Sequence, residues 1–273
     1  MTERAVRVAG HFGELMQGRI GPDGPVALIS LPCPVLVLEA RLRPGPGLSV
    51  HGAGQRLMTP ERARRFLHGL GLPLSGRVTM RATMPAGGGA GASTAALVAL
   101  ARLAGARLRP EALARAATGS EGASDPLMFP AAERLLWASR AGRVLDALPP
   151  LPRLDVIGGF HGPPRRTEAR DKAFPDIADL IDPWRRAAAA GRAAALAELA
   201  AISAARTLAL RGPEGDPTAD LARQLGAAGL VIGHTGSARG LLFLPDRIPG
   251  AATQVLREAG MSGIVRFRVG GCG

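Results

Sequence analysis

The spacing of hydrophobic residues predicts that the first half of the chain begins with strands and continues with helices. Strands are expected where apolar residues alternate with polar ones or form short runs, at 5–9, 26–31, 35–42 and 76–83. Helices are expected where helix-forming residues follow a proline or precede a glycine, at 60–70, 95–104 and 110–117. A hairpin turn is expected at 21–24, which contains glycine, proline and aspartate.

The second half opens after a proline-rich stretch at 149–152, which predicts a boundary between domains at 1–150 and 151–273. Further strands are expected at 154–159, 230–232, 240–243 and 263–269, and helices at 176–205, 217–225 and 254–259. The long helical stretch should break at Pro183, and Gly191 is a second candidate for a break. This order of elements is typical of a ferredoxin-like α+β layer, with helices on one face of an antiparallel sheet.

Segment 84–96 joins a predicted strand to a predicted helix and contains four glycines. Glycine and alanine leave the backbone of such a loop bare, so an anion can approach several N–H groups at once. The first N–H groups of a helix are unpaired and partly positive, which suits a phosphate. The hydroxyl of Ser93 can add a bond to the phosphate or to a magnesium ion. The segment therefore predicts a phosphate-binding loop.

Three other interpretations of this loop are possible, and two of them require residues that the sequence lacks. A Walker P-loop needs a lysine before the serine, but Ala92 stands there and Lys172 is the only lysine in the chain. A dinucleotide-binding fingerprint fits Gly87-x-Gly89-x-x-Ala92, but an acidic residue at the end of the next strand is missing. A flexible turn without a ligand stays open as the third interpretation.

Polar residues also gather at 10–18, where His11, Glu14 and Gln17 stand between small residues. An ordinary turn with a solvated glutamate would explain this segment as well as a binding site does. A third glycine-containing segment lies at 233–240, between two predicted strands. A hairpin turn would account for it, and its histidine would then serve in packing or capping.

Two carboxylates near the end of the predicted helix at 110–117 are candidates for chemistry. Glu121 and Ser93 can supply oxygen ligands to a magnesium ion if this helix faces the loop. Asp125 can accept a proton from a substrate hydroxyl. Ser124 and Asp125 before Pro126 fit the capped start of a helix equally well.

The three glycine-containing segments together resemble the motifs of the GHMP small-molecule kinases. The second motif, P-x-x-x-G-[LM]-[GA]-S-S-[AT]-A, is matched at Pro85, Gly89, Gly91, Ser93, Thr94 and Ala95. The sequence departs from this motif at Ala90, which replaces a large apolar residue, and at Ala92, which replaces the first serine.

The first and third motifs are similar to those of the L-threonine kinases of cobalamin synthesis. The form G-E-L-x-Q-G is matched at Gly13, Glu14, Leu15, Gln17 and Gly18. The form H-[ST]-G-x-x-x-G-L is matched at His234, Thr235, Gly236, Gly240 and Leu241. The E-P-T-D-S stretch of these kinases is matched at Glu121, but the acid falls one place later, at Asp125.

The resemblance implies an α+β chain with the two-domain GHMP-kinase fold. The N-terminal domain should contain a left-handed βαβ crossover, the C-terminal domain should be ferredoxin-like, and the active site should lie between them. It implies ATP-dependent phosphorylation of L-threonine to O-phospho-L-threonine, with Mg²⁺ held by Ser93 and Glu121 and with Asp125 as a candidate base. The phosphates would bind at Pro85, Gly87, Gly88, Gly89, Ala90, Gly91, Ala92, Ser93 and Thr94, and the acceptor at His11, Glu14, Gln17, His234, Thr235, Gly236 and Arg239.

Within the acceptor pocket, Arg239 is the candidate for a substrate carboxylate, because a guanidinium can grip one with two hydrogen bonds. Arg166 and Arg206 are its rivals. Two alternative functions remain open. One is a GHMP kinase for another small alcohol, such as homoserine or a polyol. The other is a catalytically silent GHMP-fold protein that binds a nucleotide, an idea favoured by Ala92 and by the shifted acid at Asp125.

Composition narrows the partners and the compartment. The net charge of +12 arises from arginines that are dispersed along the sequence without interleaved aromatic residues, so no nucleic-acid partner is expected. The 47% apolar content is ample for a core, no apolar run is expected to be long enough to span a bilayer, and the N-terminus has no signal-peptide pattern. The two cysteines, Cys33 and Cys272, make no metal spacing, so a cytoplasmic protein without a disulfide framework is expected.

Overall fold

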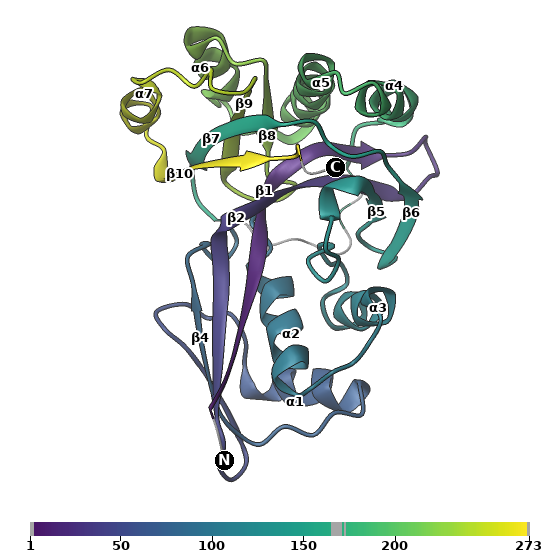
Figure 1. Cartoon of the computed structure of the whole chain (residues 1–273), viewed down its shortest axis with the longest axis vertical. Coiled ribbons are helices and arrows are strands. Elements are labelled where there is room, and N and C mark those ends of the chain that lie inside the picture. Colours follow the sequence, from purple (N-terminus) through teal and green to yellow (C-terminus); the bar gives the residue numbers. More distant parts are fainter. Residues whose placement is uncertain (1–2, 165–170, 172, 272–273) are drawn as a thin grey trace.

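The computed structural model describes residues 3–164, 171 and 173–271 and shows a mixed α+β protein (Figure 1). Eight strands form one continuous path in the order β10-β7-β9-β8-β1-β2-β4-β3, and β5 and β6 extend the sheet from β2. Helices α4 to α7 cover one end of the molecule, and α1 to α3 lie at the other end (Figure 1). The α+β class predicted from the sequence is confirmed.

The hairpin of β1 (Arg4–Arg19) and β2 (Val26–Arg43) forms the spine of the sheet. The sequence predicts shorter strands, at 5–9, 26–31 and 35–42, because glycine and proline interrupt the apolar pattern. In the structure the strands continue through these interruptions with shifts of register after Ala9, His11 and Glu14. Such irregularities bend a strand and redirect its side chains. The predicted motif at 10–18 therefore lies in a distorted strand rather than in a loop.

The N-terminal half continues with β3 (Leu48–Gly52), α1 (Pro60–Gly69), β4 (Gly76–Ala82), α2 (Ala92–Leu103) and α3 (Pro110–Glu121). β3 pairs with β4 in parallel, so α1 is the helix of a β-α-β connection. The left-handed sense of this crossover stays a prediction of the family resemblance. The apolar helix α2 packs beneath β1 and β2, which fixes its N-terminus next to the distorted part of β1.

The C-terminal half comprises β7 (Leu154–Phe160), α4 (Ala178–Ala189), α5 (Ala193–Arg211), α6 (Thr218–Leu225), β8 (Gly229–Ile232), β9 (Ala238–Phe243), α7 (Ala252–Glu258) and β10 (Ser262–Val269). Its strands are antiparallel, as the ferredoxin-like prediction requires. The break predicted at Gly191 is confirmed. The break predicted at Pro183 is wrong, because α4 continues through it with Leu180 and Trp184 buried on either side.

Between the halves, the sequence signals no strand in the region where η1 (Ala132–Arg134), β5 (Leu135–Ala138) and β6 (Arg143–Ala147) are found. β5 pairs with β2 through Leu28 and Trp137. A strand bridge between Glu14 and Ile232 joins β1 to β8, and one apolar cluster includes residues of both halves. The boundary at 150/151 stays a prediction.

Arg41, Arg43, Arg77 and Arg81 are dispersed in sequence but line one hollow of about 360 Å³ on β2 and β4, together with Glu3 and Glu39. The expectation that no nucleic acid binds stays a prediction, whereas one other expectation drawn from composition needs correction. Helix α5, with a mean hydropathy of 1.5, is by length and composition long enough to cross a membrane, so the expectation that no apolar stretch is that long is wrong. In this fold one stripe of α5, including Leu196, Ala200 and Ser203, is buried and packs on β1 and β8.

Candidate active site

The three glycine-containing segments converge at the centre of the molecule. The amides of His11 and Gly13 donate to the carbonyls of Ala90 and Gly89 at 3.3 and 3.4 Å, which ties β1 to the 84–96 loop. The amide of Ala238 donates to the carbonyl of Gly88 at 2.9 Å, which ties the third segment to the same loop. A Cβ added at Gly236 would overlap the backbone of Gly88 and Gly89. Segments far apart in sequence thus form one compact unit.

The 84–96 loop has the geometry of a helix entry. Gly87, Gly89 and Gly91 have φ values of +77°, +76° and +77°, a region that glycine enters without steric cost. Gly91 is the N-cap residue of α2, and no side chain caps the helix. The first amide groups of α2 therefore have no capping oxygen from a side chain, as a helix terminus that binds an anion requires.

Oxygen atoms gather beside this helix entry. The Ser93 hydroxyl donates to Glu121 Oε1, and the Thr94 hydroxyl lies 3.4 Å from Glu121 Oε2. The side chain of Glu121 is about one tenth exposed. Hydroxyl and carboxylate oxygens are the ligands that Mg²⁺ prefers, so the two residues predicted to hold it, Ser93 and Glu121, fit such an ion. Arg62 of α1, which the sequence did not single out, also contacts Ser93 and Glu121.

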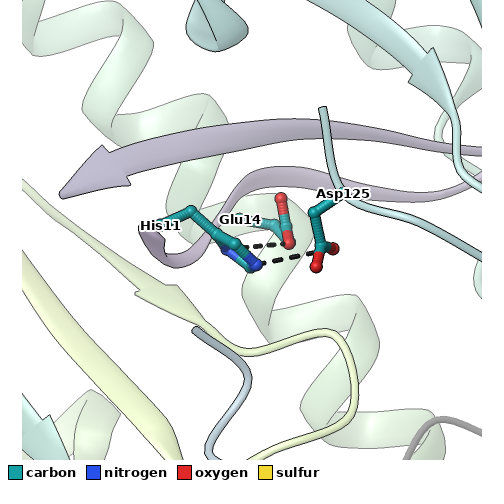
Figure 2. A group of neighbouring side chains, drawn as sticks. All are labelled: His11, Glu14 and Asp125. Carbon is teal, nitrogen blue, oxygen red and sulfur yellow. Dashed lines mark ion pairs between the residues drawn. The ribbon is translucent and has the colours of Figure 1, made fainter. Parts of the chain in front are cut away.

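A second polar cluster lies behind the loop, where His11 stands between two carboxylates (Figure 2). His11 Nδ1 lies 3.4 Å from Glu14 Oε1, and His11 Nε2 lies 3.4 Å from Asp125 Oδ1. His11 and Glu14 are buried, whereas the Asp125 side chain keeps about a quarter of its surface exposed. These residues come from the distorted part of β1 and from the segment after α3.

The charges of this cluster depend on one another. Burial alone would lower the pKa of His11, but the Asp125 and Glu14 carboxylates outweigh it and raise that pKa to about 9. Burial raises the pKa of Glu14 to about 7 despite the nearby His11. Burial also opposes ionisation of Asp125, but the charge and hydrogen bond of His11 lower the Asp125 pKa below its usual value. His11 is therefore a cation at neutral pH, and Asp125 is an anion whose side chain is partly exposed.

The structure explains why the acid stands at 125 rather than at 124. Ser124 is buried, its hydroxyl lies 2.6 Å from Thr118 Oγ1, and its carbonyl accepts a 2.6 Å hydrogen bond from Trp137 Nε1. The amide of Asp125 donates to Thr94 Oγ1 at 3.2 Å, which brings this carboxylate beside α2. No helix begins in the described segment 122–131, so the alternative of a capped helix start is wrong.

The third segment borders a cleft of about 620 Å³, with His234, Thr235 and Gly236 on one side and Arg211 on another. The His234 ring stacks on Phe174 with centroids 4.6 Å apart. Burial, together with the positive charges of Arg211 and Arg140, lowers the pKa of His234 to about 3. His234 therefore lines the cleft as a neutral side chain and cannot form an ion pair with a substrate carboxylate.

Two of the predicted acceptor residues are engaged in holding the fold. Gln17 donates its side-chain amide to the Ile232 carbonyl at 3.0 Å and is buried. Arg239 is buried, pairs with Asp216 at 2.6 Å and donates to the carbonyls of Gly236 and Ala238 at 3.1 and 2.9 Å. This geometry disfavours Arg239 as the residue that binds a substrate carboxylate.

The rival cations differ in position. Arg206 makes two bonds to Asp179, at 2.6 and 2.7 Å, and Arg166 lies outside the described residues. Arg211, which the sequence did not single out, lines the cleft, pairs with Asp171 at 2.6 Å and lies over the Phe174 ring. No local sequence signal marks it, because it stands at the end of an alanine-rich helix.

Neither a protein-family model nor a curated protein sequence matches this chain. Solved structures do match over almost the whole length. The mevalonate kinase of L. major, solved with R-mevalonate, has a TM-score of 0.68 at 18% identity, covering 98% of this chain and 96% of its own. The homoserine kinase of Cytophaga hutchinsonii has a TM-score of 0.63 at 17% identity, covering 97% and 95%. The mevalonate kinase of methicillin-resistant Staphylococcus aureus has a TM-score of 0.64 at 16% identity, covering 99% and 100%.

This chain has the GHMP-kinase fold. The predicted fold class is thereby confirmed, and the glycine-containing segments at 10–18, 84–96 and 233–240 meet in it. In the GHMP-kinase fold of this chain, the oxygen cluster around Glu121 and the charged cluster around His11 lie on either side of Thr94.

We expect Arg239→Ala to lower the free energy of unfolding by about 3–5 kcal/mol, because it leaves Asp216 as a buried charge without its partner. Bonds from Thr218 and Arg239 lower the pKa of Asp216 against the effect of burial, so this carboxylate stays ionised. Urea unfolding measures the change. Arg206→Ala, which removes an exposed ion pair, should cost about 0–1 kcal/mol. Equal small losses in both variants would contradict a structural role for Arg239.

Gly236→Ala should separate the third segment from the 84–96 loop, because the new Cβ meets backbone rather than a movable side chain. The expected cost is about 1–3 kcal/mol in the free energy of unfolding, as for other overpacked positions. Gly250→Ala is the control, since no atom lies within 4 Å of a Cβ built there. A wild-type melting temperature in Gly236→Ala would contradict this prediction, because it would show that the two segments can move apart at no cost in stability.

The His11 imidazole should titrate near pH 9 in an NMR pH titration, and Asp125→Asn should move its pKa down toward the ordinary value of 6.5. The sign follows from the raised pKa: the protonated form is stabilised in the fold. The His11 contribution to stability is therefore complete below pH 6.5 and is lost as the pH rises through about 9. An unchanged His11 pKa in Asp125→Asn would contradict the charge coupling.

Proposed function

We propose that this protein transfers the terminal phosphoryl group of ATP to the hydroxyl of a small acceptor, and that the acceptor is L-threonine. The observation that carries the proposal is the position of Asp125. It is held ionised by His11 and bonded through its backbone to Thr94, next to the Ser93–Glu121 oxygen cluster. A base and a phosphate-binding helix entry then face the same space.

On the nucleotide side, the bare loop at 85–94 would bind the ATP phosphates through the amides at the start of α2. Ser93 and Glu121 would hold the magnesium ion, which neutralises the negative charge of the phosphates. Phosphoryl transfer depends chiefly on such positioning and neutralisation, so the protein needs few covalent steps of its own.

On the acceptor side, Asp125 would take the proton of the attacking hydroxyl while its oxygen bonds to the γ-phosphorus and the bond from that phosphorus to the ADP oxygen breaks, so that ADP leaves. His11 cannot serve as the base at neutral pH, because its raised pKa keeps it protonated. Its part is to hold the Asp125 carboxylate in place. The cleft beside His234 offers room for a small molecule, and Arg211 brings a positive charge to its wall.

L-threonine is favoured as the acceptor by the sequence of two segments. Gly13-Glu14-Leu15-x-Gln17-Gly18 and His234-Thr235-Gly236 resemble the L-threonine kinases of cobalamin synthesis. The product would be O-phospho-L-threonine, formed in the cytoplasm. Homoserine is the second candidate, because a homoserine kinase is among the structures with this fold. The two acceptors differ only in where the hydroxyl stands relative to the shared carboxylate and ammonium groups.

The test is turnover of ATP by the pure protein with Mg²⁺ and a panel of L-threonine, L-serine, L-homoserine and 1-amino-2-propanol, with products identified by ³¹P NMR. We expect L-threonine to be the best acceptor and 1-amino-2-propanol to be poor, because it lacks the carboxylate. Loss of the charged hydrogen bonds that the carboxylate would make in the cleft typically costs about 1–3 kcal/mol.

Ser93→Ala is the matched inactive control, and its turnover should fall by about a hundredfold or more because one group that holds the metal is lost. Equal rates with L-threonine and 1-amino-2-propanol would contradict recognition of the carboxylate. ATP binding without transfer to any acceptor would leave a silent nucleotide-binding protein.

A further inference from the structure

Arg62 places a positive charge beside the predicted phosphate site. It is the third residue of α1, and its backbone amide donates to the N-cap side chain of Thr59 at 3.2 Å, which fixes the first turn of the helix. Its guanidinium Nη2 contacts Glu121 Oε1 and lies 3.3 Å from Ser93 Oγ. Glu121 is 59 residues away in sequence, so only the tertiary structure brings them together.

Two of the contacts to Glu121 end on the same oxygen. Ser93 Oγ and Arg62 Nη2 each bind Glu121 Oε1. A divalent cation held by Ser93 and Glu121 would lie close to this guanidinium and would repel it. Arg62 and the metal ion therefore compete for Glu121. The Arg62 side chain is about a quarter exposed, so it has solvent on one side into which to move.

The phosphate-binding loop itself supplies no cation. The segment 84–96 contains neither lysine nor arginine, and Lys172 is the only lysine of the chain. Charge on a transferred phosphoryl group is otherwise met by helix amides and the metal ion. A guanidinium that approaches from α1 adds a full positive charge with a planar set of donors, which matches phosphate oxygens well.

We infer that Arg62 is a phosphate-binding residue that exchanges partners. In the nucleotide-free protein it neutralises Glu121, and when the metal–ATP complex binds it leaves Glu121 for a phosphate oxygen of the nucleotide. The inference rests on the proposed function. It assigns to α1 a role in nucleotide binding that none of the three glycine-containing segments supplies.

The experiment compares Arg62→Gln with the wild type in two binding measurements that need no turnover. Mn²⁺, as a probe for Mg²⁺, is titrated into the nucleotide-free protein by calorimetry or electron paramagnetic resonance. Arg62→Gln should bind Mn²⁺ more tightly, by about tenfold, because the competing cation is gone. ATP with Mg²⁺ should bind more weakly, by about tenfold or more, because one charged phosphate contact is lost.

The opposite signs separate this role from a structural one. If Arg62 only oriented Glu121, its loss would weaken Mn²⁺ binding as well, and that result would overturn the inference. Arg62→Lys should keep Mn²⁺ affinity near the wild-type value and recover part of the ATP affinity. Arg64→Gln, on the exposed side of the same helix, is the control and should change neither. Glu121→Gln should abolish the gain in Mn²⁺ affinity that Arg62→Gln produces.

The outcome also distinguishes this inference from the proposed function. Unchanged Mn²⁺ and ATP affinities in a folded Arg62→Gln, with wild-type binding intact, would overturn the role of Arg62 alone. A wild-type protein that binds neither Mn²⁺ nor ATP would overturn the proposed function and this inference with it. Circular dichroism and the melting temperature establish that each variant is folded.

Discussion

The site depends on backbone contacts between three segments that leave no room for side chains. β1 reaches the carbonyls of Gly89 and Ala90, and the segment before β9 reaches the carbonyl of Gly88. A Cβ at Gly10 or Gly236 would overlap the 84–96 loop. These contacts hold the start of α2 at a fixed distance from the distorted part of β1. The positions of the charged groups follow from this packing, because each group is attached to one of the three segments or to a helix that packs on them.

Around this frame the charges are arranged in two clusters that meet at Thr94. Its hydroxyl lies near Glu121 on one side and accepts a bond from the backbone of Asp125 on the other. In the first cluster Arg62 balances Glu121, and in the second His11 balances Asp125 and Glu14. Burying several ionisable groups is costly unless they are paired. The pairing with His11 keeps Asp125 ionised at the place where a phosphate and a hydroxyl would have to meet.

Much of the local structure could be predicted from the sequence. Gly191 ends a helix and Pro60 begins one because their backbone preferences act over a few residues. A helix after the glycine-rich loop was predicted for the same reason, although α2 begins at Ala92 rather than at 95. Strands β3, β5 and β6 were not, because their residues carry no clear alternation; β3 pairs with β4, β5 joins the sheet through β2, and β6 pairs with β5. The helix break predicted at Pro183 was wrong because burial of the neighbouring Leu180 and Trp184 outweighs the local cost of a proline inside the helix.

The sequence by itself determined most of the helices and several strands, the glycine-rich helix entry and the set of polar residues near it. Those features depend on neighbours in the chain. Only the tertiary structure decided which charged side chains pair with one another. In it Arg239 pairs with Asp216, Asp125 lies beside His11, and the neighbouring Ser124 is buried in the core. It also brought Arg62 to Glu121, although nothing near Arg62 in the sequence marks it. The physical reason is that an ion pair depends on distances of a few ångströms, and these arise when separate elements pack together rather than from the local pattern of residues.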